Sequence, residues 1–203
     1  MTEKDYLVLS RYVPEASMPI LKHWFNQAPF ILNITKKRTT KLGDFRGEVG
    51  KQLCKISVNQ NLNPYSFLIT LTHEFAHLLV WNKYKNKVNP HGKEWKNTFT
   101  ELLNVLLQHH IFPDDLTPMV IKHAKQPKAS SQADVLLTKA LNKYNPTNNL
   151  VHLMELAHGT VFTLNNKRTF KKGEKRRTRY LCEELTTKRK YLIHGVAEVN
   201  VLE

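Results

Sequence analysis

The chain has 203 residues, of which 41% are hydrophobic and 24% charged, and this composition excludes an intrinsically disordered protein. Thirty-one Lys and Arg against 17 Asp and Glu give a formal net charge of +14. Two cysteines, Cys54 and Cys182, are too few for a disulfide framework or a four-cysteine zinc site. Apolar runs fall short of the roughly 18 residues of a membrane helix, and residues 1–12 lack a signal-peptide pattern. We therefore expect a cytoplasmic protein, nucleoid-associated if it is bacterial, with no membrane partner.

The positive charge is concentrated near the C-terminus. Residues 165–191 contain 11 basic and 3 acidic side chains. A field of this strength attracts polyanions, and nucleic acid is the commonest of them. The alternative is a well-solvated basic face without a partner.

Short elements are expected before residue 60. Residues 19–28 carry apolar side chains at helical spacing, at Ile20, Leu21, Trp24 and Phe25. Three apolar segments with glycines between them predict short strands at residues 30–34, 42–46 and 55–58.

Two longer helices follow. Asn63 is a good N-cap and Pro64 suits the first helical position, so the first helix begins here and extends to about Trp81. Nearly all its positions are apolar, which predicts a central, buried helix. The second helix starts after Pro90 and ends before Pro113. Its apolar stripe consists of Trp95, Phe99, Leu102, Leu103, Leu106 and Leu107.

The pattern changes after residue 113. Residues 113–131 are rich in Pro, Lys and Ser and predict a linker or an extended arm. A capping-box pattern at residues 131–134 predicts a short helix to about Tyr144. From Leu150 onward, apolar segments separated by polar turns predict short strands at residues 160–164, 177–181 and 191–194.

The segment His73-Glu-Phe-Ala-His77 lies inside the buried helix. Residues four apart share a helical face, so both imidazoles can reach one metal ion, with Glu74 beside them directed at a metal-bound water. Zinc suits imidazole ligands, and three protein ligands leave a fourth position for water. The alternative is a pair of core histidines satisfied by hydrogen bonds, which leaves two imidazoles and a carboxylate costly to bury.

A third ligand is required, and His91 at the start of the second helix is the preferred candidate. Packing the two apolar stripes together brings the first turn of the second helix near His73 and His77. Glu94 then suits a role beside the ligands rather than among them. The rival ligands are Glu94, Glu101, His109 and His110.

Residues 71–78, LTHEFAHL, followed by His91-Gly-Lys-Glu-Trp95, resemble the SprT-like family of zinc metallopeptidases, which includes Spartan. Residues 38–45 resemble the basic, glycine-containing strand pair that precedes the active-site helix in that family. The resemblance covers roughly residues 10–110. It implies that His73, His77 and His91 bind one Zn²⁺ and that Glu74 is the general base.

The resemblance also implies an α+β fold with a minimal zincin-like protease domain, in which the HExxH helix packs on a small sheet and a second helix. We place this domain at residues 1–112, a linker with a short helix at 113–149, and a small basic β-rich module at 150–203. For studied members, the family implies DNA-dependent cleavage of proteins crosslinked to DNA. The expected partners are protein substrates and single-stranded or distorted DNA, and the oligomeric state stays open.

Many family members carry a cysteine-paired zinc ribbon after the catalytic region, whereas this chain contains no CxxC. We expect the β-rich module to replace the ribbon and contact nucleic-acid phosphates. Phe170, Tyr180 and Tyr191 are either base-stacking side chains or the core of the module, and Cys182 is expected to be buried. The basic candidates are Lys171, Lys172, Lys175, Arg176, Arg177 and Arg179.

These observations together predict a zinc-dependent endopeptidase acting on proteins bound or crosslinked to DNA. Glu74 is expected to activate water at the metal and pass a proton to the leaving amine. One alternative is a non-catalytic zinc protein associated with DNA or RNA. Another is a hydrolase of a small amide, for which a closed pocket is expected in place of a groove.

Overall fold

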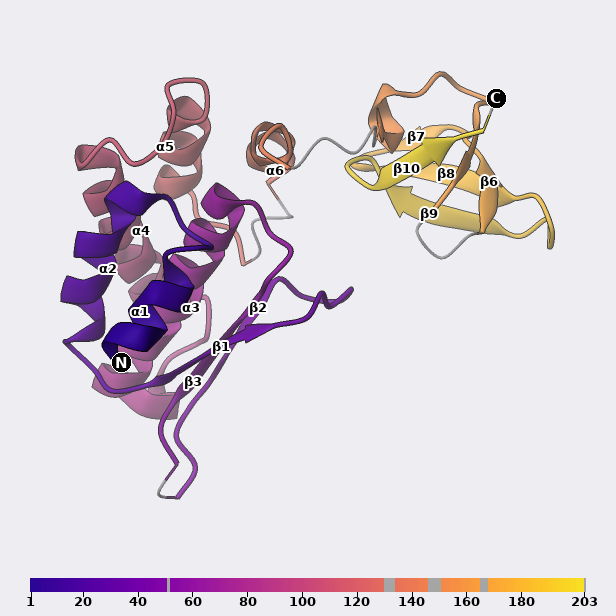
Figure 1. Cartoon of the computed structure of the whole chain (residues 1–203). Helices are drawn as coiled ribbons and strands as arrows, with labels where there is room; N and C mark the ends of the chain where they lie inside the picture. The colour runs from indigo at the N-terminus through magenta and orange to yellow at the C-terminus, as the bar shows by residue number, and fades with distance from the viewer. Residues whose placement is uncertain (51, 130–133, 146–150, 165–167, 203) are drawn as a thin grey trace. The chain divides into compact units, whose positions relative to one another are not determined.

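The computed structural model describes residues 1–50, 52–129, 134–145, 151–164 and 168–202, and the chain divides into two compact units (Figure 1). The first unit spans Met1–Asn145 and the second spans Pro146–Glu203. Each unit has its own hydrophobic core. Within the described part of the chain, no helix is long and apolar enough to cross a membrane.

The first unit begins with two short helices and a three-stranded sheet. Helix α1 (Glu3–Leu9) was not predicted, and its N-terminus is closed by a capping box between Thr2 and Asp5. A 3₁₀ turn (Glu15–Ser17) leads into helix α2 (Met18–Phe25), which buries the predicted apolar stripe. The strands are β1 (Ile31–Thr35), β2 (Gly43–Arg46) and β3 (Lys55–Asn59).

The sheet has the order β1-β3-β2, so β2 lies at an edge. Strand β1 runs parallel to β3, and β2 runs antiparallel to it. Helix α3 (Pro64–Tyr84) contacts β3 and β2, as Figure 1 shows, and ends in a 3₁₀ turn (Lys85–Lys87). The edge strand therefore passes beside the helix that carries the HExxH segment.

Helix α3 forms as its sequence predicts. The Asn63 side chain accepts a hydrogen bond from the Ser66 N–H at 2.9 Å, and Pro64 occupies the first turn. Eleven of its 21 residues are buried, because the sheet covers one side of the helix and α4 (Lys93–Gln108) packs on another. The Trp95 and Phe99 side chains of α4 are fully buried in this contact.

The segment after residue 113 differs from the predicted linker. Helix α5 (Thr117–Lys125) packs on α4, and helix α6 (Val135–Asn142) packs on α5. Residues 131–133 of the predicted capping box lie outside the described residues, and Asp134 caps α6 through the Leu137 N–H at 3.2 Å. Apolar side chains at helical spacing bind both helices to the core of the first unit, namely Leu116, Val120, Ala124, Leu137, Ala140 and Leu141. The first unit accordingly extends to Asn145 rather than to residue 112.

The second unit is a small antiparallel β structure. Its elements are β4 (Val151–His152), a 3₁₀ turn (Leu153–Glu155), β5 (Val161–Thr163), β6 (Thr169–Lys171), β7 (Lys175–Arg176), β8 (Arg179–Glu184), β9 (Lys190–His194) and β10 (Glu198–Val201). The strand order is β4-β10-β5-β6-β8-β7, with β9 paired to β8. The core contains Leu153, Phe162, Phe170, Cys182 and Val199. The predicted mixed α+β composition with a β-rich C-terminal part is confirmed.

Candidate metal centre

Helix α3 and the turn before α4 bring three histidines together. The Nε2 atoms of His77 and His91 are 3.1 Å apart, and those of His91 and His73 are 3.2 Å apart. Among the described residues, these three form the group of His, Cys, Asp and Glu side chains placed to hold a metal ion. Tetrahedral ligands at a Zn–N distance of 2.0–2.1 Å are separated by about 3.3 Å, so the donor set and its spacing fit zinc.

Trp95 fixes the three imidazoles from the α4 side. Its ring centroid lies 4.5 Å from that of His73, 5.2 Å from that of His77 and 4.7 Å from that of His91. Its indole N–H donates to the His73 carbonyl oxygen at 3.4 Å. A single buried side chain thereby ties the first turn of α4 to the histidine face of α3.

The turn that presents His91 is closed by glycine. The Gly92 N–H donates to the Asn89 carbonyl oxygen at 2.9 Å. A Cβ at position 92 would lie 3.0 Å from that oxygen, tighter than most real Cβ contacts. Gly92 therefore lets His91 stand at the N-terminus of α4, facing His73 and His77.

The histidines favour the neutral form. Burial, reinforced by His77 and His91, lowers the pKa of His73 to about 2. Burial and His91 lower the pKa of His77 to about 4. Burial and the nearby Lys96 ammonium lower the pKa of His91. Imidazoles that stay unprotonated keep their lone pairs available to a cation.

Glu74 is buried beside the histidines, with 7% of its surface exposed. Burial and then the Asp44 carboxylate raise its pKa to about 8, whereas the Arg38 and Lys41 charges and a hydrogen bond from the Phe45 backbone oppose this shift. Gly43 on β2 permits the close approach, because a Cβ there would lie 2.7 Å from Thr70 Cγ2 and 2.9 Å from Glu74 Oε1. The edge strand is thus packed directly against the carboxylate.

The comparisons with known proteins agree with this geometry. The SprT-like family model matches residues 20–114. Protein SprT of Photorhabdus laumondii subsp. laumondii is 34% identical over 102 residues, which cover 46% of this chain and 52% of that protein. Protein SprT of Shigella boydii serotype 18 is 40% identical over 70 residues, which cover 32% of this chain and 42% of that protein.

Residues 20–114 form a SprT-like domain. Its match spans about half the length of these curated relatives. No solved structure matches the chain. The SprT-like domain and the three clustered histidines are consistent with a zinc metallopeptidase.

Two cavities meet at the centre of the SprT-like domain. The larger, about 480 Å³, extends from His73 and Glu74 toward Trp81 and Pro90. The smaller, about 160 Å³, extends from the same two residues toward Thr70 and His123. Gly43, His73, Glu74 and Ala129 line both cavities. Glu74 therefore lies between two hollows along β2 rather than at the end of one.

The rival ligands lie elsewhere. Glu94 is half-buried in the first turn of α4, and Glu101, His109 and His110 are exposed farther along or just beyond that helix. None of these four belongs to the histidine cluster among the described residues.

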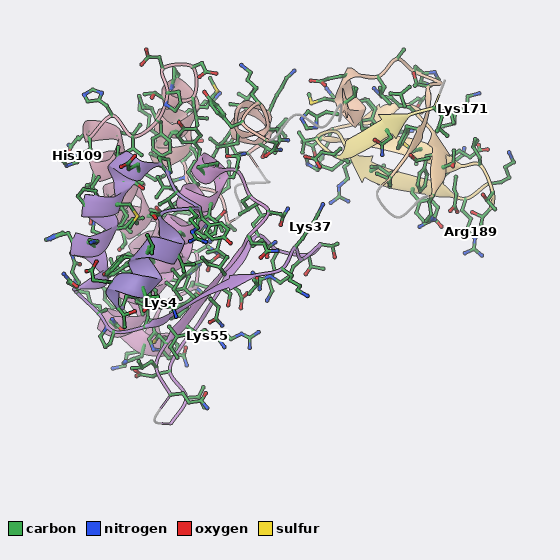
Figure 2. All side chains as sticks on the ribbon, in the orientation of Figure 1. Lys4, Lys37, Lys55, His109, Lys171 and Arg189 are labelled. Atoms are coloured by element: carbon green, nitrogen blue, oxygen red, sulfur yellow. The ribbon has the colours of Figure 1, made fainter. Side chains whose placement is uncertain are left out.

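The basic candidates of the second unit fall into two groups. Lys171, Lys175, Arg176, Arg177 and Arg179 are exposed on β6 and on the hairpin of β7 and β8, and Figure 2 labels Lys171 there. Lys172 is buried instead, because alternate residues of β6 and its continuation face the core. Its Nζ donates to the carbonyl oxygens of Leu156 at 2.6 Å and Met154 at 3.4 Å. Lys172 is therefore a structural residue rather than a surface cation.

The aromatic candidates also pack inward. Phe170 is 1% exposed, and Tyr180 and Tyr191 pack partly buried against the same core. The Arg168 guanidinium covers the rings of Phe170 and Tyr191, and Lys172 covers that of Tyr180. The structure agrees with the interpretation that these rings belong to the core of the module rather than stack on bases. Cys182 is buried, as expected.

Sequence reasoning missed three groups near the site. The Phe45 backbone forms a hydrogen bond with Glu74, and no side-chain pattern in the sequence indicates such a contact. Asp44 forms an ion pair with Arg38 beside Glu74, and the sequence of the segment that contains both residues indicates only two basic strands. His123 lines the smaller cavity, and as a lone histidine in a segment interpreted as a linker it gave no spacing signal.

Proposed function

We propose that the chain is a zinc-dependent endopeptidase with a minimal zincin-like domain. The observation that carries this proposal is the convergence of three imidazole Nε2 atoms, 3.1 and 3.2 Å apart, beside the buried carboxylate of Glu74. His73, His77 and His91 would hold the ion. When bound, zinc polarises a substrate carbonyl and lowers the pKa of water.

Glu74 is the residue that moves the proton. A cation held by the three histidines would favour the ionised form of Glu74. As the water oxygen bonds to the peptide carbonyl carbon, this carboxylate takes a proton from that water. It then delivers this proton to the amide nitrogen as the C–N bond breaks, which releases a carboxylic acid and an amine. Gly43 leaves room for Glu74 against β2, where the Phe45 backbone supplies a hydrogen bond to its carboxyl group.

The two cavities favour a polypeptide over a small amide. A substrate whose cleaved bond lies at Glu74 can extend into the 480 Å³ cavity on one side and the 160 Å³ cavity on the other. An endopeptidase needs room on both sides of the bond, whereas a small amide fills a single pocket. This arrangement supports cleavage within a chain.

The substrates proposed are proteins bound or crosslinked to DNA, in the cytoplasm or at a nucleoid. The support is the exposed basic hairpin of the second unit, where Arg176, Arg177 and Arg179 lie within four residues. Such a cluster suits phosphate contacts to single-stranded or distorted DNA. Tethering the protease to the polymer that carries its substrate raises the effective concentration of substrate.

Cleavage of a DNA-binding protein by the zinc-loaded enzyme tests this function, with and without single-stranded DNA, for the wild type and Glu74→Gln. We expect the wild type to cleave only with both zinc and DNA, and the variant to bind both without cleaving. Cleavage by Glu74→Gln at the wild-type rate would refute the mechanism. Zinc and DNA binding without any cleavage would favour the non-catalytic alternative.

A further inference from the structure

The smaller of the two cavities, about 160 Å³, is lined by a histidine that the proposed mechanism does not use. His123 on α5 is 1% exposed and lines this cavity together with His73, Glu74 and Phe99. Its ring packs edge-on against Phe99, with the centroids 5.9 Å apart. Phe99 packs in the same way against His73, with the centroids 5.4 Å apart. His123 and the metal-site histidine His73 therefore flank one aromatic ring.

Asp134 fixes the orientation of His123. The carboxylate Oδ2 lies 3.0 Å from His123 Nδ1, while Oδ1 caps α6 through the Leu137 N–H. Both carboxylate oxygens of Asp134 therefore have partners. The Thr100 hydroxyl on α4 fixes α5 in addition, because it donates to the Ala124 carbonyl oxygen at 2.7 Å. With Asp134 as its acceptor, Nδ1 carries the ring proton.

The other ring nitrogen of His123 faces no hydrogen-bond partner in the part of the chain that the structure describes. His123 Nε2 is buried and makes no hydrogen bond among the described residues. Leaving a buried polar atom without a partner destabilises a fold, so such an atom points to a partner that another molecule supplies. In the neutral form of the ring with the proton on Nδ1, Nε2 offers a lone pair to a hydrogen-bond donor.

We propose that His123 is a substrate-binding residue of the smaller cavity, an inference that rests on the endopeptidase function proposed above. Its Nε2 accepts a hydrogen bond from a backbone N–H of the polypeptide that occupies the smaller cavity, and Asp134 orients the ring. A backbone donor is present in every polypeptide, so this contact serves a protease of low sequence specificity. The contact lies on one side of the cleaved bond, next to Glu74.

Two substitutions separate this role from a structural one. Asn places an amide near the position of Nδ1, so His123→Asn keeps a donor for Asp134 and ends short of the cavity. Gln places its amide near the position of Nε2, so His123→Gln keeps an acceptor toward the cavity and loses the Asp134 contact. A purely structural histidine predicts that Asn is tolerated at least as well as Gln. A substrate-binding histidine predicts the reverse order.

The experiment measures peptide binding and cleavage separately. A dye-labelled, net-neutral, unstructured 20-residue peptide is titrated with zinc-loaded protein carrying Glu74→Gln, alone or combined with each His123 variant. A neutral peptide avoids simple attraction to the +14 chain. The same His123 variants are then assayed for cleavage of this peptide and of a DNA-binding protein, with DNA present. His109→Asn, at an exposed position after α4 (Figure 2), is the matched control, and thermal unfolding checks each fold.

We expect His123→Asn to weaken peptide binding and raise KM roughly tenfold with little change in kcat, and His123→Gln to recover most of the loss. Zinc affinity should stay unchanged in both variants. The proposal would be overturned if all the proteins bound the peptide equally or if none bound it. It would also be overturned if peptide affinity fell only in proportion to thermal stability. Peptide binding that depends on position 123 without cleavage by the wild type would refute the endopeptidase function and leave the binding role standing.

Discussion

Individual residues set the geometry of the SprT-like site, and His91 is the clearest case. It is the histidine of the cluster supplied from outside α3, and its Nε2 atom lies within 3.2 Å of those of His73 and His77. Replacing His91 with Ala would leave two of the three proposed ligands. Loss of a residue that only supports a ligand lowers metal affinity by roughly 10–100-fold, so we expect a larger fall in zinc affinity here. Competition with a chelator measures this. His110→Ala, at an exposed position, is the control, and equal affinity in both variants would show that His91 is not a ligand.

Gly43 sets the distance between the edge strand and Glu74. An added Cβ would meet Thr70 Cγ2 at 2.7 Å and Glu74 Oε1 at 2.9 Å. We expect Gly43→Ala to destabilise the first unit by about 1–3 kcal/mol, as overpacking does, and to reduce cleavage by displacing Glu74. Urea unfolding measures the stability. Combining it with Thr70→Ser removes the clashing methyl group and should restore part of the stability. No recovery in the double variant would mean that the methyl is not the source of strain.

At the scale of elements, helices α5 and α6 decide whether residues 113–145 are a linker or part of the folded domain. Leu137 and Leu136 are adjacent on α6, yet Leu137 is fully buried and Leu136 is 49% exposed. We expect Leu137→Ala to cost about 2–5 kcal/mol and Leu136→Ala less than about 0.5 kcal/mol. Urea unfolding followed by tryptophan fluorescence measures both, since Trp24, Trp81 and Trp95 all lie in the first unit. Equal, small effects would restore the linker interpretation.

The same elements show what the sequence could and could not predict. Helix α3 was predictable because its N-cap, its proline and its apolar positions agree. Helix α5 was not, because Pro118 and several lysines suggested a linker, although Leu116, Val120 and Ala124 recur every four residues. His73 and His77 share a spacing on one helix, which is why both were found. His123 meets the site only through the packing of α5 on α4, which no local pattern encodes.

At the scale of the whole molecule, the second unit has its own response to acid. Hydrogen bonds from Arg168 and then Thr187 lower the pKa of Glu184 from 4.5 to about 2. A carboxyl group with a lowered pKa stabilises the fold above its ordinary pKa, and this contribution is lost as the pH falls through the folded value. We therefore expect the second unit to lose stability between about pH 4.5 and pH 2.

The urea midpoint of the second unit, followed by NMR through the amide resonances of β8, measures this loss at each pH. Glu184→Gln should be less stable than the wild type at neutral pH and should lose this pH dependence. Glu183→Gln is the neighbouring control on the same strand, and its side chain is more exposed, at 41% against 7%. An unchanged acid response in Glu184→Gln would place its origin elsewhere.

The net charge of the whole chain and the basic hairpin predict different responses of DNA binding to salt. If Arg176, Arg177 and Arg179 each contact a phosphate of single-stranded DNA, replacing all three with Gln should flatten the plot of log affinity against log salt by roughly 2. The control replaces Lys93, Lys96 and Lys122, exposed in the first unit, and removes the same charge. Because counterion release requires local contact, we expect the slope to change in the first variant alone. Fluorescence anisotropy with labelled single-stranded DNA measures both slopes, and equal changes would mean that binding depends on net charge rather than on the hairpin.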